Sequence, residues 1–126
     1  MSTPRLGDYL GHMLEAVGLA CSYVEGMTKE DFLDDKRTQQ AVVLNLIVAG
    51  EVATKILKEH EDFAAQNPSV PWSSMKGMRN RIAHGYYDIN LDTVWETVQS
   101  ALPKLQKQLT EIKTIGVMDR GASSQS

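Results

Sequence analysis

Apolar residues recur at steps of three and four along most of the chain, the spacing that places them on one face of an α-helix. Alternation of apolar and polar residues over five or more positions, which marks a half-buried strand, does not occur in the sequence. The pattern therefore predicts an all-α fold, an antiparallel four-helix bundle without an internal repeat or a second domain. We expect this bundle to span residues 1–118 and a disordered polar tail to occupy residues 119–126.

Two long helices are predicted in the N-terminal half of the chain. The first runs from about Leu6 to Glu25, and Gly26 is placed to end it, since glycine suits the backbone conformation that follows a helix. Thr28 and Asp31 then have the spacing of a capping box, so a short helical turn is expected there. The second long helix runs from about Asp35 to Ala65. Its apolar stripe is formed by Ala41, Leu44, Val48, Val52 and Leu57 and is widened by Val43, Leu46 and Ile47.

Gly50 and Glu51 are unusual residues for the middle of this second helix. Glycine costs about 1 kcal/mol relative to alanine inside a helix, and the usual compensation is the close approach of another helix. A glutamate in so apolar a helix suggests a buried, paired carboxylate. We expect Glu51 to pair with Arg79 or with Arg81, and the spacing does not choose between them.

A third helix is predicted after the proline-containing segment 67–71. It begins near Trp72 or Ser73, with Ser73 or Ser74 as its N-terminal cap, and it ends near Ala83, where Gly85 can stop it.

The fourth helix is predicted to run from about Leu91 to Ile115, with Asn90 or Asp92 as its cap. Pro103 falls inside its apolar pattern. Because proline lacks the backbone N–H and its ring clashes with the preceding turn, we expect it to kink the helix or divide it.

The composition narrows the function classes. The 126 residues are 42% apolar and 23% charged, as in ordinary soluble globular proteins, and the net charge of −3 argues against a general nucleic-acid coat. The single cysteine, Cys21, excludes a disulfide framework and a cysteine-based zinc finger. The longest apolar run, at 41–50, is too short to cross a bilayer and no signal peptide is visible, so a cytoplasmic location is expected.

One segment concentrates the candidate chemistry. Residues 66–87 contain no acidic residue, while Lys76, Arg79 and Arg81 supply three positive charges to the third helix. Asn80 and His84 are four residues apart and share a helix face, and Arg79 lies about 100° around the axis from Asn80, so these three side chains can converge on one ligand. Arg81 projects to the other side. We expect Lys76, Asn80 and Arg81 to bind the substrate.

These residue types suit metal-independent cleavage of RNA. An arginine fork binds phosphate oxygens, and histidine gains and loses a proton near neutral pH. The ribose 2′-OH would attack the adjacent phosphorus, His84 would move a proton, and Arg79 would stabilise the developing negative charge. We expect no metal and no cofactor.

Simpler interpretations of the same residues stay open. An arginine and a histidine on an amphipathic helix are usually part of a solvated polar face. Tyr86 and Tyr87 follow Gly85 beside the candidate site, although spacing alone favours core packing for at least one of them. The charged run 59–62 is expected to be solvated rather than a metal site, and Cys21 is expected to be packed rather than nucleophilic.

The segment Arg79–Tyr86 resembles the Arg-x4-His-x-Tyr motif of the HEPN superfamily, specifically of HepT-like toxins. The resemblance extends to the Gly50–Glu51 pair, to the Val70–Trp72 entry into the third helix, and to the Asp88–Trp95 start of the fourth. It therefore covers most of the chain and implies a bundle of the HEPN type.

The resemblance also implies an activity and partners. HepT-like proteins are ribonuclease toxins encoded beside a small nucleotidyltransferase of the MNT type, which is the antitoxin. HEPN domains form homodimers whose two motifs meet in a composite cleft. Carried over to this chain, Arg79 and His84 would be the catalytic pair, Asn80 the polar residue that commonly follows the arginine, and Tyr86 the hydroxyl to which the partner transfers AMP.

Two other functions remain as alternatives. The third helix can instead hold a nucleotide or a nucleic-acid end without cleaving it, as a non-catalytic partner subunit of a nucleotidyltransferase, and the acidic net charge favours this. A purely structural helical dimerisation partner is the third possibility.

Overall fold

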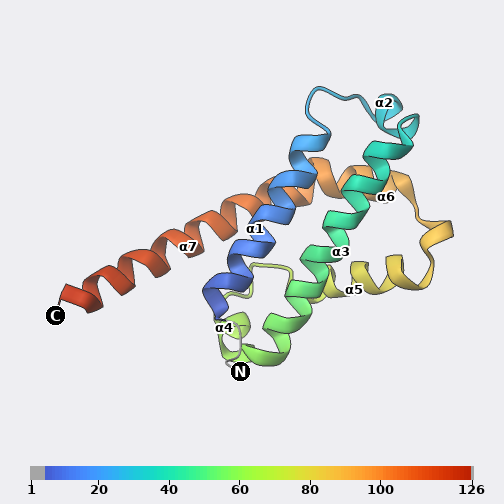
Figure 1. Ribbon diagram of the computed structural model, residues 1–126. Coiled ribbons are helices and arrows are strands. Elements are labelled where there is room, and N and C mark those ends of the chain that lie inside the picture. The colour runs from blue at the N-terminus through green and yellow to red at the C-terminus, as the bar shows by residue number, and fades with distance from the viewer. Residues whose placement is uncertain (1–4, 126) are drawn as a thin grey trace.

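The computed structural model describes the backbone of residues 5–125 and the side chains of residues 5–113. Helices form all the regular structure in these residues, so the all-α prediction is confirmed (Figure 1). The long helices α1 and α3 lie side by side and antiparallel, α5 packs against α3, and α7 packs against α1 (Figure 1). The elements are α1 (Leu6–Tyr23), α2 (Lys29–Leu33), α3 (Lys36–Glu59), α4 (Glu61–Gln66), α5 (Trp72–His84), η1 (Tyr86–Asp88), α6 (Leu91–Glu96), η2 (Thr97–Ala101) and α7 (Leu102–Gln125).

The core lies between the apolar faces of α1 and α3 and those of the C-terminal elements α6, η2 and α7. The apolar stripe of α1 is buried almost as its spacing predicts, with Leu6 alone half-buried at its start. The largest fully buried side chains come from six separate elements and belong to one hydrophobic cluster, which shows that a continuous core joins these elements. They are Phe32, Met13, Ile56, Leu109, Val17, Val42, Val94 and Val98.

The predicted stripe of α3 is partly wrong. Leu44 is 60% exposed and Val48 is 37% exposed, although both were expected to face the core. α3 is apolar on most of its surface, so the spacing of its apolar residues does not define a single buried face. The helices that pack on α3 decide which of its residues are buried. Because α1 and α5 both pack against α3, two of its sides are buried and a third is left in solvent. The buried residues of α3 are Val42, Val43, Leu46, Ala49, Gly50, Val52, Ala53 and Ile56.

The second predicted helix is divided in the structure. Instead of continuing to Ala65, α3 ends at Glu59, and His60 has non-helical backbone angles (φ −136°, ψ 49°) before α4 begins. Side chains at the break are held by the start of α1: the Tyr9 hydroxyl donates a 2.8 Å hydrogen bond to Glu59, and the Tyr9 ring meets His60 edge-on. These tertiary contacts override the helical pattern of the sequence.

The local signals around α2 are confirmed. α1 ends at Tyr23 with Val24 as its cap, two residues before the predicted end at Glu25, and Gly26 has a left-handed φ of +76° in the turn that follows. Thr28 and Asp31 form the predicted capping box with reciprocal hydrogen bonds of 3.1 and 3.0 Å. The buried side chain of Phe32 attaches α2 to the core, where its ring centroid lies 5.4 Å from that of Trp95.

The predicted serine cap of the third helix is wrong. α5 begins after Pro71 without a side-chain cap, and Ser73 and Ser74 are exposed residues of its first turn. Trp72 fixes this end of the helix instead. Its ring is buried beside Phe63, and its indole N–H donates a 3.0 Å hydrogen bond to the Asn67 carbonyl.

The fourth predicted helix is divided at the expected place. Asn90 caps α6 by accepting a 3.1 Å hydrogen bond from the Thr93 N–H. The helix then widens into the π-helical segment η2, in which the Leu102 N–H donates to the Thr97 carbonyl five residues back, immediately before Pro103. Pro103 has no backbone N–H to donate to the preceding turn, and its ring would clash with that turn in a regular α-helix. The wider π turn makes room for the ring.

The boundaries at the end of the chain were predicted only in part. α7 extends to Gln125, beyond the expected end near Ile115. The side chains of residues 114–126 lie outside the described residues, so the disordered tail at residues 119–126 stays a prediction.

α3 is long and apolar enough to cross a membrane by length and composition. However, half of the most apolar 18-residue stretch of α3 is buried inside the bundle, and the core helix of a soluble protein has the same length and composition.

Candidate active site

α5 carries Lys76, Arg79, Arg81 and His84, the basic residues that the sequence singles out. Trp72 near its start and Ile82 near its end are the two buried side chains of the helix, and they fix it on the bundle. Met75 and Met78 are partly buried and also pack on the core, and the polar residues of α5 occupy its remaining surface. α5 packs most closely against α3, so the side chains on that flank of α5 meet the middle of α3.

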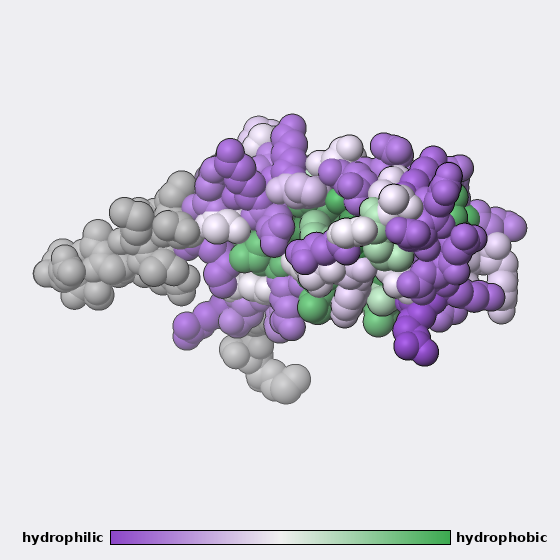
Figure 2. Space-filling model, turned by 90° about the horizontal axis from the view of Figure 1, so that it is seen from above, coloured by the Kyte–Doolittle hydropathy of each residue, from purple (hydrophilic) through white to green (hydrophobic). Residues whose placement is uncertain are grey.

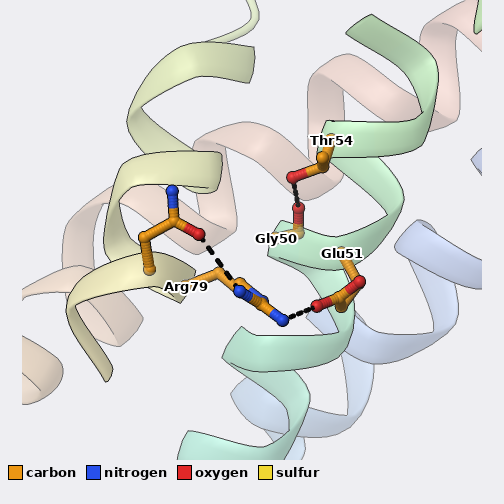
Figure 3. Close-up of polar contacts among 5 residues, drawn as sticks. Gly50, Glu51, Thr54 and Arg79 are labelled. Atoms are coloured by element: carbon orange, nitrogen blue, oxygen red, sulfur yellow. Dashed lines mark hydrogen bonds and ion pairs between the residues drawn. The ribbon is translucent and has the colours of Figure 1, made fainter. Parts of the chain in front are cut away.

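Gly50 is the point where α3 and α5 come closest. A Cβ built at Gly50 would collide with the Cβ of Arg79 and lie 2.8 Å from the Met75 carbonyl oxygen. The close approach of another helix, expected from a glycine in a helix interior, is therefore confirmed. The absence of a side chain at Gly50 leaves the space that the Arg79 side chain occupies. The Gly50 carbonyl also accepts a 2.9 Å hydrogen bond from Thr54 within α3 (Figure 3).

Glu51, the next residue of α3, forms an ion pair with Arg79. Figure 3 shows the Arg79 guanidinium extending from α5 to this carboxylate. The structure thus selects Arg79 rather than Arg81 as the partner that the sequence left open. The two side chains are 34% and 42% exposed, and a pair so accessible to water contributes only about 0–1 kcal/mol to stability.

Asn80 interacts with Arg79 rather than with His84. Its Oδ1 accepts a 3.1 Å hydrogen bond from Arg79 Nη1, which fixes the guanidinium from a second side. The Arg79 Nε is buried and has no hydrogen-bond partner. Arg79 is thus held by one residue of α3 and one of α5, with a donor nitrogen unused.

His84 is the last residue of α5 and is exposed. Within residues 5–113 its imidazole makes no hydrogen bond or ion pair. The helix ends at Gly85, whose N–H donates a 3.0 Å bond to the Arg81 carbonyl, so the predicted stop is confirmed. The ring of His84 is therefore free to contact a substrate or another molecule.

Lys76 and Arg81 are both exposed. The Arg81 guanidinium lies back over Gly77, and its side chain lines one open groove with Thr93 of α6 and another with Leu46 of α3. Binding of substrate by either cation stays a prediction, and Arg81 does not join the Arg79 side of α5.

Tyr86 and Tyr87 are exposed, so the prediction that at least one of them packs in the core is wrong. Tyr86 is 47% exposed and Tyr87 is 99% exposed, and their rings meet edge-on at 6.0 Å in η1. Both residues follow His84 in the chain, after Gly85. The spacing failed here because Ile89 and Leu91, after the turn, pack on the core in their place.

The other chemically distinctive residues have structural surroundings. Glu59 accepts the hydrogen bond of Tyr9, and Cys21 is half-buried, with burial and then the charge of Glu25 raising the pKa of its thiol. A thiol with a raised pKa is a poorer nucleophile at neutral pH. Among the described residues, no group of three or more histidine, cysteine or acidic side chains is arranged to hold a metal ion.

Known proteins similar to this chain share one description. A family model described as "Ribonuclease HepT-like" matches residues 13–112. The chain is 36% identical over 112 residues, 89% of its own length and 96% of the relative's, to "Putative RNase TTE0752" of Caldanaerobacter subterraneus subsp. tengcongensis. It is 33% identical over 106 residues, 84% of its length and 94% of the relative's, to "Probable ribonuclease HepT" of Thermococcus cleftensis. No solved structure was found to match it.

Proposed function

Because this chain belongs to the HepT-like ribonuclease family, we propose that it is a metal-independent endoribonuclease and acts as a toxin. The observation that supports this most directly is the surface of α5. Arg79 is held at a fixed place by Glu51 and Asn80, and the exposed His84 follows five residues later on the same helix.

The proposed reaction is a transesterification within RNA. The 2′-oxygen of a ribose forms a bond to the adjacent phosphorus, and the bond from phosphorus to the 5′-oxygen of the next nucleotide breaks. One proton leaves the 2′-OH and one is supplied to the leaving 5′-oxygen, and His84 carries one of these transfers. The Arg79 guanidinium stabilises the negative charge that develops on the phosphate oxygens.

The two proton transfers favour a site built from two chains. One imidazole cannot remove and supply a proton at the same moment, whereas a pair of His84 residues facing each other can divide the two roles. A two-fold axis beside α5 would also bring two Arg79 residues to one phosphate-binding cleft. We therefore propose a homodimer.

An exposed apolar surface on α1 and α3, the α1–α3 face, is the proposed dimer contact. It consists of Leu19, Tyr23, Leu44 and Val48. Leu19 and Val48 line one shallow groove, and Val48 is three residues before Glu51, so the face adjoins the Glu51–Arg79 pair. Hydrophilic side chains cover much of the molecule's surface seen from above, with hydrophobic groups between them (Figure 2). Exposed apolar groups that adjoin a site are typical of an interaction surface.

Analytical ultracentrifugation tests the dimer. Leu44→Glu is expected to shift the protein to monomers and to abolish RNA cleavage, because it would bury an unpaired carboxylate of each protomer in the apolar contact. Leu33→Glu is the matched control, since Leu33 is 39% exposed on α2 and lies outside the α1–α3 face. A parent protein that sediments as a monomer would contradict the proposal.

RNA cleavage in the presence of EDTA tests the activity. The parent protein is expected to cleave RNA and to arrest growth when expressed alone, and Arg79→Ala or His84→Ala to abolish both effects. Arg5→Ala removes an exposed arginine that precedes α1, far in sequence from α5, and this variant is expected to behave as the parent. If His84→Ala arrests growth as the parent does, the catalytic assignment fails.

Regulation by a nucleotidyltransferase antitoxin is the second part of the proposal. A partner of the MNT type would transfer AMP from ATP to the Tyr86 hydroxyl in the cytoplasm, forming a phosphodiester bond to the tyrosine oxygen and releasing pyrophosphate. The 47% exposure of Tyr86, two residues after His84 in the chain, supports this, because an attached AMP would add bulk and negative charge near the end of α5. Mass spectrometry of co-expressed protein should show AMP-sized increments that vanish in Tyr86→Phe and persist in Tyr87→Phe.

A non-catalytic partner subunit remains the second candidate, and one observation favours it. The net charge of −3 repels long RNA outside the cleft, so the site can serve a single nucleotide better than a polymer. This function predicts nucleotide binding that needs Arg79, with no RNA cleaved at any protein concentration.

A further inference from the structure

The terminal nitrogens of Arg79 are engaged within the chain itself. Nη2 is paired with the Glu51 carboxylate, and Nη1 donates to the Asn80 amide oxygen. The Nε, which is buried, has no partner. A guanidinium binds a carboxylate and a phosphate through the same N–H groups, so a phosphate that reaches Arg79 either displaces Glu51 or Asn80 or binds beside them through the remaining N–H groups.

The two positions are not equivalent for an approaching anion. Displacing Asn80 leaves a neutral amide that water can satisfy. Displacing Glu51 leaves a carboxylate beside a phosphate, and the two negative charges repel each other. Glu51 is 42% exposed, which is enough for the carboxylate to turn towards solvent, and its place on α3 is fixed by the close contact at Gly50.

We propose that Glu51 is an internal competitor of the RNA phosphate and the positioning residue that holds Arg79 between turnovers. This proposal rests on the ribonuclease function proposed above. Glu51 keeps the guanidinium in one orientation and neutralises it, so the substrate phosphate must either open the pair or bind Arg79 beside a carboxylate that repels it.

The competitor makes the site selective for a polymer over a free anion. A small anion such as inorganic phosphate gains only the contacts of Arg79, and these are opposed by Glu51. An RNA strand has further phosphates that reach the cationic surface of α5, where Lys76 is exposed, and their attraction offsets the opening of the pair. Glu51 thus lowers occupation of the site by the small phosphates of the cell.

Titration with inorganic phosphate tests this without any cleavage. The readout is the NMR signal of the Arg79 Nε–H, which reports on a nitrogen that is buried and unpartnered in the described structure. Glu51→Gln keeps the side-chain shape and removes the charge, and it is expected to bind phosphate about tenfold more tightly, because one opposing charge next to the anion is lost. With RNA as substrate, KM should fall by a similar factor while kcat stays within about twofold, since substrate and transition state gain alike.

Two controls separate charge from shape and from overall electrostatics. Glu51→Asp keeps the charge and is expected to bind phosphate as the parent does. Asp92→Asn removes the carboxylate of the exposed ion pair with Lys29, the same change in net charge outside the site, and is also expected to behave as the parent.

The outcomes divide cleanly. Unchanged or weaker phosphate binding by Glu51→Gln overturns the proposal, and so does equal tightening by Asp92→Asn or by Glu51→Asp. Phosphate binding that the Glu51→Gln change strengthens, in a parent protein that cleaves no RNA, refutes the ribonuclease function and leaves the competition intact.

Discussion

Gly50 lies directly against the side chain of Arg79, with no room for a Cβ between them. The contact joins a backbone position in the middle of α3 to the proposed phosphate-binding group on α5. The packing of the two helices and the placement of the guanidinium therefore depend on the same residue.

Gly50→Ala is expected to destabilise the fold and to impair the site together. The added methyl group forces α5 away from α3, and overpacking of this kind costs about 1–3 kcal/mol, which exceeds the gain of about 1 kcal/mol in helix propensity. Urea unfolding and RNA cleavage measure the two effects. Gly18→Ala is the control, because a Cβ there meets only the flexible end of Gln106 at 3.4 Å, and it should leave stability unchanged or raised. Equal stability of the two variants would refute the close-contact explanation.

Thr28→Ala and Ser73→Ala should differ although both remove a hydroxyl from the start of a helix. Thr28 accepts the Asp31 N–H in the capping box of α2, so its loss is expected to cost about 1 kcal/mol. Ser73 is exposed and caps nothing, so its replacement should stay within about 0.5 kcal/mol of the parent. Chemical denaturation at neutral pH distinguishes the two, and a larger loss for Ser73→Ala would restore the serine cap that the sequence suggested.

Tyr9 should make the fold sensitive to alkaline pH. Burial, followed by the hydrogen bond to Glu59 and its charge, raises the pKa of Tyr9 above the ordinary value of 10.0. Above pH 10 the unfolded chain ionises first, so the stability provided by the neutral phenol is lost as pH rises towards the folded-state pKa. In urea unfolding between about pH 8 and 11, Tyr9→Phe should show a shallower alkaline loss than the parent.

Tyr87→Phe is the control for this pH dependence. The Tyr87 ring is 99% exposed, so its replacement should leave the alkaline limb as steep as in the parent. A Tyr9→Phe variant with the parent's alkaline slope would show that Tyr9 does not set it.

Lys76→Ala and Arg81→Ala should affect RNA binding unequally. Both residues are exposed cations of α5, but Arg81 lies over Gly77 on the side that faces α6. If Lys76 contacts one phosphate, its removal should weaken binding and reduce the slope of log affinity against log salt by about 1. Arg81→Ala should change the slope less. Binding isotherms at several salt concentrations measure this, and a larger change for Arg81→Ala would place the RNA on the α6 side.

The features that could be predicted from the sequence are local. The Thr28 capping box, the Asn90 cap and the turn at Gly26 depend on residues within a few positions of one another, and all three are present. The disruption at Pro103 follows from a missing N–H and likewise needs no tertiary information.

The features that could not be predicted depend on contacts between distant segments. α3 ends at Glu59 because the start of α1 holds the residues of the break, and Leu44 is exposed because α1 and α5 occupy other sides of α3. The same holds within the site. Spacing alone left Glu51 between two arginines, and the packing of α5 at Gly50 decided for Arg79.

The wide turn of η2 has a consequence for insertions and deletions. Each residue of an α-helix rotates the following ones by about 100°, and a π turn holds one residue more than an α turn. Removing one residue from Thr97–Ala101 would therefore restore an α turn and leave α7 close to its present phase, whereas adding one would rotate all of α7 by roughly 100°. Leu105 and Leu109, which are now buried, would then turn out of the interior. This short stretch sets the rotational phase of the C-terminal helix, and a one-residue insertion there should be far more damaging than a one-residue deletion.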